Sequence, residues 1–201
     1  MMLFFKSRVN DRPKKIKHYR EHDNFSRTDL ASKLFISSKI IKKYGKAKLI
    51  TATNVFAHID NINNIVKSIL KTLTLDGIFI SESHYLLPLI KTVQYDTIYH
   101  EHLRYYSLAS LNYLFKKHNL EIIDTKEIPT HGGSIRVYAA RKGLYKISKN
   151  VKKQFKKESK FLNKKSFNQF RKNVVNSKVN LFNIIKKIRT NISLAPFQKP
   201  L

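Results

Sequence analysis

Apolar and polar positions in the middle of the chain follow two different periods. Residues 48–52 form a short apolar run, which is typical of a strand buried on both faces. From 62 to 73, apolar side chains recur every three or four residues, which predicts an amphipathic helix with Asp60 as its N-cap. Turn residues follow, and residues 78–82 are a second apolar run. The pattern therefore predicts a strand, a helix and a second strand.

The next stretch repeats this alternation. Ser107 is a candidate N-cap for a helix over 108–115, and Asn119 stands where a left-handed helix end is expected. Residues 120–123 predict a third strand, and alternating apolar and polar side chains predict a fourth at 134–140, with one wetter face. These elements predict the α/β class, as part of a Rossmann-like sheet. Four strands are too few for such a sheet, and the strand at 48–52 would pair with a missing first strand. We therefore expect this strand to have an open edge, and the chain to self-associate or to be marginally stable.

The two flanks of this middle segment are simpler in pattern. Residues 30–44 predict one helix, and helical spacing from 148 to 190 predicts one long helix or two shorter ones. We therefore expect three regions: a basic N-terminal segment with one helix (1–47), an α/β domain (48–141), and a long lysine-rich helical segment with a frayed tail (142–201).

The net charge of the 201 residues is +27, and most of the excess lies in the flanks. Residues 48–140 contain nine cationic and eight acidic side chains, whereas residues 141–201 contain 18 cationic side chains and one acidic side chain. Fifteen of those 18 are lysines, which lack the bidentate fork of arginine. We therefore expect weak, sequence-independent association with polyanions and no base-specific recognition.

Composition also excludes several classes of site. The absence of cysteine from these residues excludes disulfides, a thiolate zinc site and a cysteine nucleophile. The apolar start, Met-Met-Leu-Phe-Phe, is too short for a signal-peptide core, and no run approaches the ~18 apolar residues of a membrane-spanning helix. We therefore expect a cytoplasmic protein.

Residues 84–106 are rich in aromatic side chains and histidines and lack a clean period, which predicts a long functional loop with helical pieces. Ligands bind outside the carboxyl ends of strands in an open α/β sheet. Two polar groups follow strands there: residues 53–58, which end in His58, and residues 99–102, Tyr-His-Glu-His. A histidine can remove a proton from carbon beside a carbonyl, a carboxylate can orient its ring, and a tyrosine hydroxyl can stabilise the resulting oxyanion.

Each group also has a simpler interpretation. His58 alone is typical of a capped or core histidine, and Tyr-His-Glu-His is compatible with a surface turn. On an extended segment, His100 and His102 would point the same way, so they could bind a metal together with His84 or His131.

Short motifs at characteristic separations lie between residues 54 and 137, within a resemblance that runs from about residue 35 to residue 141. They are Asn54-Val55-Phe56-Ala57-His58, Asp76-Gly77, Tyr85-Leu86-Leu87, Tyr95-Asp96-Thr97-Ile98-Tyr99-His100-Glu101-His102, Tyr105-Tyr106-Ser107-Leu108 and His131-Gly132-Gly133-Ser134-Ile135-Arg136-Val137. On these motifs the chain resembles the S-adenosylmethionine-dependent C-methyltransferases that act on keto deoxysugars attached to nucleoside diphosphates. Tyr-His-Glu-His together with His-Gly-Gly-Ser is the most specific part of the resemblance.

The resemblance implies methyl transfer from S-adenosylmethionine to the carbon beside the sugar's keto group, a reaction that needs no metal. His102, the last residue of Tyr-His-Glu-His, would act as the base. The matching Tyr99, Glu101 and His58 would orient the substrate or stabilise the enolate. Asn54 would lie beside the cofactor.

His131, Gly132 and Gly133 would bind the nucleotide-linked sugar by the same resemblance. The chain departs from the family at both ends, however. Members begin with a cysteine-rich zinc module, continue with a glycine-rich turn that binds the cofactor, and extend into a further α/β domain. Residues 1–47 contain no cysteine and a single glycine, and the sequence stops where the further domain would begin.

The chain is therefore expected to be the middle of a methyltransferase, truncated at both ends. We expect its activity to depend on an upstream methyltransferase half, and we expect it to bind S-adenosylmethionine weakly and to be inactive when isolated. The alternative is a degenerate methyltransferase core that serves as a basic protein binding nucleic acid or an anionic surface.

Overall fold

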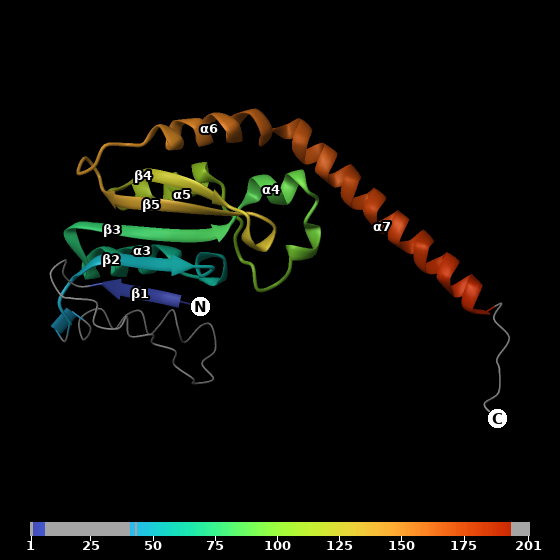
Figure 1. The fold of residues 1–201 in the computed structure, drawn as a ribbon, viewed down its shortest axis with the longest axis horizontal. Helices are drawn as coiled ribbons and strands as arrows, with labels where there is room; N and C mark the ends of the chain where they lie inside the picture. The colour runs from blue at the N-terminus through green and yellow to red at the C-terminus, as the bar shows by residue number, and fades with distance from the viewer. Residues whose placement is uncertain (1, 7–40, 43, 194–201) are drawn as a thin grey trace, which may run out of the picture.

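A computed structural model describes residues 2–6, 41–42 and 44–193, with side chains from residue 41 to residue 190 apart from residue 43. Its centre is a five-stranded sheet in the order β1-β2-β3-β5-β4 (Figure 1). The strands are β1 (Met2–Lys6), β2 (Ala47–Thr53), β3 (Leu73–His84), β4 (Leu120–Ile128) and β5 (Ser134–Arg141). β2 and β3 are parallel, and the other neighbours pair antiparallel. The predicted α/β class is confirmed.

In the part of the chain that the structure describes, five α-helices and three short 3-10 turns connect and cover the strands. The helices are α3 (Ile62–Thr72), α4 (Leu86–Lys91), α5 (Leu108–Lys116), α6 (Lys149–Phe161) and α7 (Lys164–Ser193). The turns are η2 (Phe56–His58), η3 (Tyr95–Thr97) and η4 (Thr130–Gly132). Pieces α4 and η3 interrupt the long segment between β3 and α5, as the lack of a clean period predicted.

Side chains at the helix ends explain where the helices begin and stop. Ser107 caps α5: its hydroxyl accepts the amide of Ser110, as predicted. Asn119 adopts the expected left-handed conformation after α5, with φ of 57°. The prediction of Asp60 as the cap of α3 is wrong by one residue, because the Asn61 side chain accepts the Asn64 amide at 3.2 Å.

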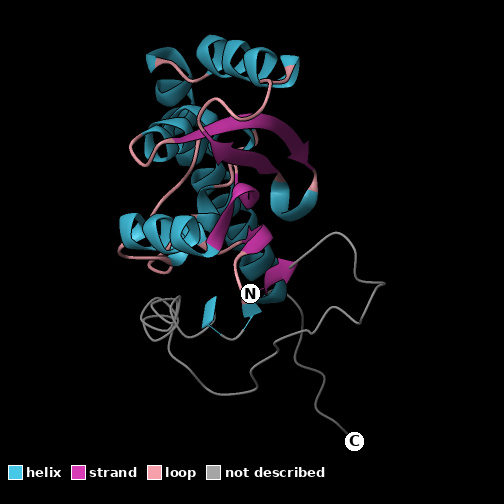
Figure 2. Cartoon of the chain, turned by 90° about the vertical axis from the view of Figure 1, so that its left-hand side faces the viewer, coloured by secondary structure: helices cyan, strands magenta, loops and turns pink. Residues whose placement is uncertain are grey.

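The core lies between the sheet and α3, α5 and α6 (Figures 1 and 2). Its centre is aromatic: the rings of Phe56, Phe79 and Phe115 contact one another, with centroids 5.7–6.3 Å apart. All three side chains are at most 1% exposed. This packing fixes η2, which carries Phe56 and ends at His58, against the sheet.

The topology brings several loops to one end of the sheet. β2 and β3 both end there because they are parallel, and β5 begins there because it is antiparallel to β3, with His84 opposite Ser134. The segment after β2, the long loop 86–105 and turn η4 therefore meet at this end, on the right in Figure 1.

The predicted open edge of β2 is wrong. β1 pairs antiparallel with β2 along its length, from Met2 opposite Thr53 to Lys6 opposite Leu49, and makes the fifth strand. The apolar start of the sequence is too short to show a period, so the sequence alone does not predict this strand.

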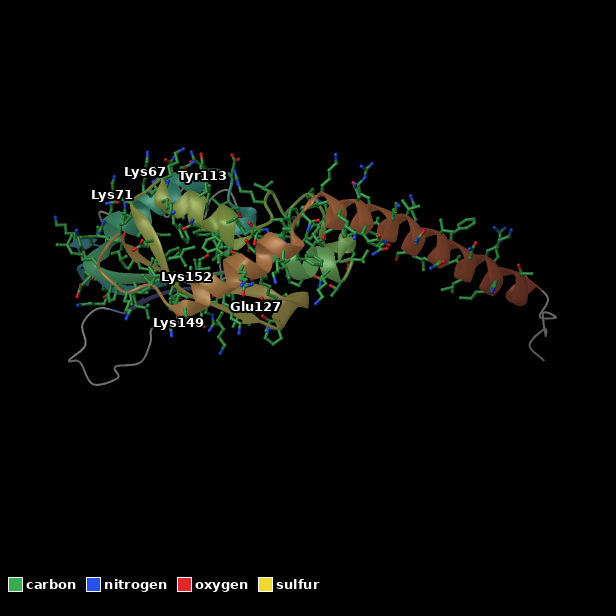
Figure 3. The ribbon with its side chains drawn as sticks, turned by 90° about the horizontal axis from the view of Figure 1, so that it is seen from above. Lys67, Lys71, Tyr113, Glu127, Lys149 and Lys152 are labelled. Atoms are coloured by element: carbon green, nitrogen blue, oxygen red, sulfur yellow. The ribbon has the colours of Figure 1, made fainter. Side chains whose placement is uncertain are left out.

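The basic C-terminal region forms two helices. Helix α6 ends before Leu162, which is its C-cap. The Asn163 side chain then accepts the Ser166 amide at the start of α7. Lys149 and Lys152 lie exposed on the first turns of α6, while α7 leads away from the body of the molecule (Figure 3). In the described part of the chain, no helix has both the length and the apolar character needed to cross a membrane.

The three predicted regions remain predictions. β1 and α6 extend the sheet and its core from outside residues 48–141. Most of the helix predicted at 30–44 lies outside the described residues. Within this range the structure describes residues 41, 42 and 44, and all three are helical.

Candidate active site

The end of β2 and the long loop meet through His58. Its Nδ1 lies 2.8 Å from the backbone carbonyl oxygen of Glu101, and the Leu103 amide donates to the carbonyl of Ala57 at 2.8 Å. These two contacts join η2 to the Tyr-His-Glu-His segment. The predicted grouping of residues 53–58 with 99–102 at the carboxyl ends of the parallel strands therefore appears in the structure.

His102 occupies the centre of an aromatic cluster. Its ring centroid lies 4.5 Å from that of Tyr99, 4.9 Å from that of His58, 5.9 Å from that of Tyr105 and 6.3 Å from that of His84. These rings come from three parts of the chain: η2, the end of β3 and the long loop. The His102 side chain is half-buried, so the cluster remains open to solvent.

Backbone carbonyls select one neutral tautomer for both central histidines. His102 Nδ1 lies 2.9 Å from the Thr97 carbonyl oxygen, and a carbonyl only accepts hydrogen bonds, so this nitrogen carries the proton. The same argument places the proton of His58 on Nδ1, which faces the Glu101 carbonyl. The unprotonated Nε2 is therefore the basic atom of each ring. His102 Nε2 lies 3.5 Å from the Tyr99 hydroxyl.

Tyr99 to His102 form a turn, with the His102 amide donating to the Tyr99 carbonyl at 3.0 Å. The assumption of an extended segment is wrong, because this bond closes the chain on itself. His100 lies on the exposed side, with its ring 5.9 Å from that of Tyr99. In the described ranges, no three histidine or acidic side chains are placed to hold a metal ion.

Burial raises the pKa values of three tyrosines beside the site. Burial raises the pKa of Tyr106 to about 12, and its hydroxyl donates to the Phe56 carbonyl. Burial also raises the pKa values of Tyr85 and Tyr105, and the Tyr105 hydroxyl donates to the same Thr97 carbonyl that binds His102. Tyr99, in contrast, is 43% exposed, and its hydroxyl lies 3.5 Å from His102 Nε2.

The His131-Gly132-Gly133 turn supports the long loop from the other side. All three residues have positive φ, and the Gln94 side-chain amide donates to the Gly132 carbonyl at 2.7 Å. Gln94 Oε1 in turn lies 3.0 Å from His84 Nε2. His131 itself is exposed, and the contacts seen in the described residues join this turn to Gln94 and not to His102.

Asn54 stands directly after β2 with φ of 54°, and its amide donates to the Glu82 carbonyl at 2.9 Å. Asn54 thus lies at the carboxyl end of β2, where the predicted cofactor contact would be. The two glycines described at this end, Gly132 and Gly133, belong to the turn before β5.

Sequence reasoning missed an ion pair on the neighbouring strands. Arg136 Nε donates to Glu82 Oε2 at 2.8 Å, and Nη2 of the same guanidinium lies 2.6 Å from that oxygen. Glu82 is 6% exposed, and its hydrogen bond raises the pKa of Arg136. The signal in the sequence is an acidic residue at the end of a predicted buried strand, with a cation in the alternating strand that follows the turn.

Comparison with known proteins gives two family matches and one close relative. The methyltransferase domain family matches residues 7–125, and the C-methyltransferase C-terminal domain family matches residues 129–193. C-methyltransferase NovU of Streptomyces niveus is 41% identical over 105 residues, which cover 52% of this chain and 25% of NovU. The matched segment thus spans a quarter of the length of this relative.

Comparison with solved structures gives partial matches, which include two bacterial methyltransferases. Magnesium protoporphyrin IX methyltransferase of Synechocystis PCC 6803, solved with bound SAH, is 14% identical, with a TM-score of 0.38 over 48% of this chain and 45% of that one. A SAM-dependent methyltransferase of Anabaena variabilis is 12% identical, with a TM-score of 0.39 over 53% and 54%.

Proposed function

The chain belongs to the methyltransferase domain family, and on this premise we propose that it contributes to an S-adenosylmethionine-dependent C-methyltransferase. The methyl acceptor is the carbon beside the keto group of a nucleotide-linked sugar. The match to the C-methyltransferase C-terminal domain and the likeness to NovU support carbon as the acceptor. The motifs at residues 99–102 and 131–134 support the sugar.

The observation that carries this proposal is the fixed tautomer of His102. Its Nδ1 donates to the Thr97 carbonyl, so its basic Nε2 is directed toward the hydroxyl of Tyr99, an exposed residue. A base next to a hydroxyl donor suits the formation of an enolate, because one group takes the proton from carbon and the other stabilises the oxygen that becomes negative.

The roles that we propose for the neighbouring residues follow from the same geometry. Tyr99 is the donor to the enolate oxygen, since His58 in its Nδ1-protonated form presents an acceptor at Nε2. His58 therefore orients a substrate hydroxyl. The Glu101 backbone carbonyl fixes the ring of His58, so part of the role expected of Glu101 belongs to its backbone. His131, Gly132 and Gly133 are proposed to bind the sugar substrate, and their turn is joined to the long loop by the hydrogen bond from Gln94.

S-adenosylmethionine supplies an electrophilic methyl group on sulfur and needs no metal. Asn54 is the residue of this chain proposed to contact it, at the carboxyl end of β2. The glycine-rich turn that completes such a site belongs to the proposed upstream half, which is the partner that the chain requires. We therefore expect the isolated chain to bind this cofactor more weakly than millimolar.

The test uses the full chain together with an upstream methyltransferase half that carries the glycine-rich turn. Two reactions are followed: methyl transfer, and exchange of the proton beside the keto group with deuterated solvent. His102→Asn removes the base but keeps a side chain of similar polarity, and we expect it to abolish both reactions. His100→Asn, two residues away and exposed, is the matched control, and we expect it to retain both.

The two reactions separate the possible failures. Exchange at the wild-type rate in His102→Asn contradicts the assignment of the base. Loss of activity on treatment with a chelator, with equal effects of the His100 and His102 substitutions, supports the metal site instead. Absence of both reactions in the wild-type complex contradicts the proposed function itself.

A second candidate function is polyanion binding, which the charge of α7 favours. The helix carries eight cations and no acid, and it leads away from the body of the molecule (Figure 1). Binding to mixed-sequence DNA should weaken steeply with salt, because each neutralised phosphate releases counterions. A defined sequence motif selected from a random pool at physiological salt would make this the primary function.

A further inference from the structure

Glu158 is a buried acid far along the chain from the histidine cluster. It lies in α6, is 3% exposed, and is the single acidic residue between positions 141 and 201. Its neighbours on the inner face of α6 are apolar: Val151 is 5% exposed, and Phe155 and Leu162 pack against the same core. A carboxylate costs free energy in such a place unless several hydrogen bonds compensate for its lost hydration.

Three donors from two segments meet this carboxylate. The Tyr85 hydroxyl donates to Oε1 at 2.9 Å, the Ala109 amide donates to Oε2 at 3.1 Å, and the Leu108 amide donates to Oε1. The two amides belong to the first turn of α5, where backbone N–H groups have no partner within the helix. Ser107 takes the next amide, so Glu158 completes the capping of α5. The positive end of the helix dipole also favours a carboxylate at this point.

The same donors mark the two ends of the site loop. Tyr85 directly follows β3, and Leu108 begins α5, so residues 86–105 form the loop between them. A parallel bridge joins Tyr85 to Tyr106, and the Leu86 amide donates to the Tyr106 carbonyl at 2.8 Å. Glu158 therefore contacts both sides of the base of the loop that carries Tyr99 and His102.

The base of the loop is also coupled to the other two parts of the site. The Tyr85 amide donates to the Gly133 carbonyl at 3.1 Å, and the Tyr106 hydroxyl donates to the Phe56 carbonyl at 3.2 Å. Phe56 begins η2, which ends at His58. A change in the position of Tyr85 or Tyr106 therefore reaches the glycine turn and His58 as well as the loop itself.

We propose that Glu158 is a positioning residue of the active site, which holds the base of loop 86–105 and so fixes His102 against His58. Its effect on catalysis rests on the proposed function, whereas its effect on the loop does not. A carboxylate suits this role because its two oxygens accept several hydrogen bonds at once. An apolar side chain would leave the two amides without partners, and the Tyr85 hydroxyl would lose its acceptor and keep the hydrogen bond it accepts from the Gln154 amide at 2.7 Å.

The test measures amide hydrogen exchange of the full chain, comparing peptides from 86–105 with peptides from α3. Glu158→Leu removes all three hydrogen bonds, and we expect exchange in the loop to rise by about tenfold or more, with a smaller change in α3. Glu158→Gln keeps one carbonyl oxygen, and we expect an intermediate rise. Tyr85→Phe removes a single donor and should change exchange in the same peptides.

Asp124→Asn is the matched control. Asp124 is an acid on β4 that also contacts α6, where its Oδ1 accepts the side-chain amide of Asn150 at 3.1 Å. Its replacement should leave exchange in the loop unchanged. Glu127 is not suitable as a control, because it accepts from Gln154, which also donates to the Tyr85 hydroxyl. If Glu158→Leu does not fold, Glu158→Gln and Tyr85→Phe still test whether Glu158 holds the base of the loop. Exchange in the loop at the wild-type rate in both of these variants contradicts the proposal.

Activity gives a second, separate readout in the complex with an upstream half. We expect Glu158→Gln to lower kcat severalfold while the KM for the methyl donor stays the same, because the donor side of the site does not involve the loop. A rise in the KM for the donor with kcat unchanged contradicts the proposed role. If the Glu158 variants exchange faster in the loop but the wild-type complex has no methyltransferase activity, the role of Glu158 in holding the loop stands and the proposed function is rejected.

Discussion

Replacement of Gly133 by alanine tests how tightly the glycine turn and the long loop fit together. Gly133 has φ of 117° and ψ of 117°, a combination that residues with a Cβ rarely adopt. A Cβ at this position would lie 2.6 Å from Pro88 Cγ and 2.8 Å from Pro88 Cβ in α4. The proline ring is rigid, so either the turn or α4 has to move.

Two terms add up in the expected loss of stability. Holding a non-glycine residue in a sparsely populated backbone region costs about 1–3 kcal/mol. Overpacking against a fixed neighbour costs about 1–3 kcal/mol more. We therefore expect Gly133→Ala to lower the free energy of unfolding by about 3–4 kcal/mol, within the sum of these terms.

Gly143→Ala isolates the first term. Gly143 has φ of 82°, and a Cβ there would meet nothing within 4 Å, so only the backbone cost of about 1–2 kcal/mol remains. Urea unfolding followed by circular dichroism gives both free energies. Equal losses in the two variants would contradict the steric argument and would mean that α4 yields to the new methyl group.

Three further predictions concern other parts of the fold. Ser107→Ala should lower the free energy of unfolding by about 1 kcal/mol in the same urea assay, because it removes the cap of α5. His118 should titrate below the ordinary pKa of 6.5, because burial and then two nearby lysines disfavour its charged form. NMR titration checks this, and the small stability it contributes should be lost as the pH falls below 6.5. Prolines at both Leu3 and Phe4 should cause self-association in light scattering, whereas two alanines should not. Of two adjacent residues in an antiparallel strand, one directs its amide toward the neighbouring strand, so the prolines break the pairing of β1 with β2.

The regular elements were predictable where a residue's neighbours in sequence decide its environment. The stripe over 62–73 became α3, and the alternation at 134–140 became β5, because periodicity reports directly which face is buried. The Ser107 cap is likewise a local interaction. β1 was missed because its pairing with β2 is a contact between residues more than 40 positions apart.

The candidate site was predictable in composition but not in arrangement. The sequence indicated that His58 and His102 lie at the same end of the sheet, because parallel strands end together. It could not indicate that backbone carbonyls, those of Glu101 and Thr97, would fix their tautomers, since every residue has a carbonyl and none is marked in the sequence. The turn at 99–102 was missed for a similar reason: its closing bond joins two backbone groups.

Glu158 shows what a further sequence argument could have used. It lies seven residues after Val151 on the apolar stripe of α6, and it is the single acid in a segment of 18 cations. An exposed acid there would be expected to face lysines. An acid on the buried stripe instead needs hydrogen-bond donors that are themselves buried in the core. Helix N-termini offer such donors without any cost of ordering a side chain. A lone acid on an apolar stripe therefore predicts contact with the start of another helix, and in this chain that helix is the one that ends the site loop.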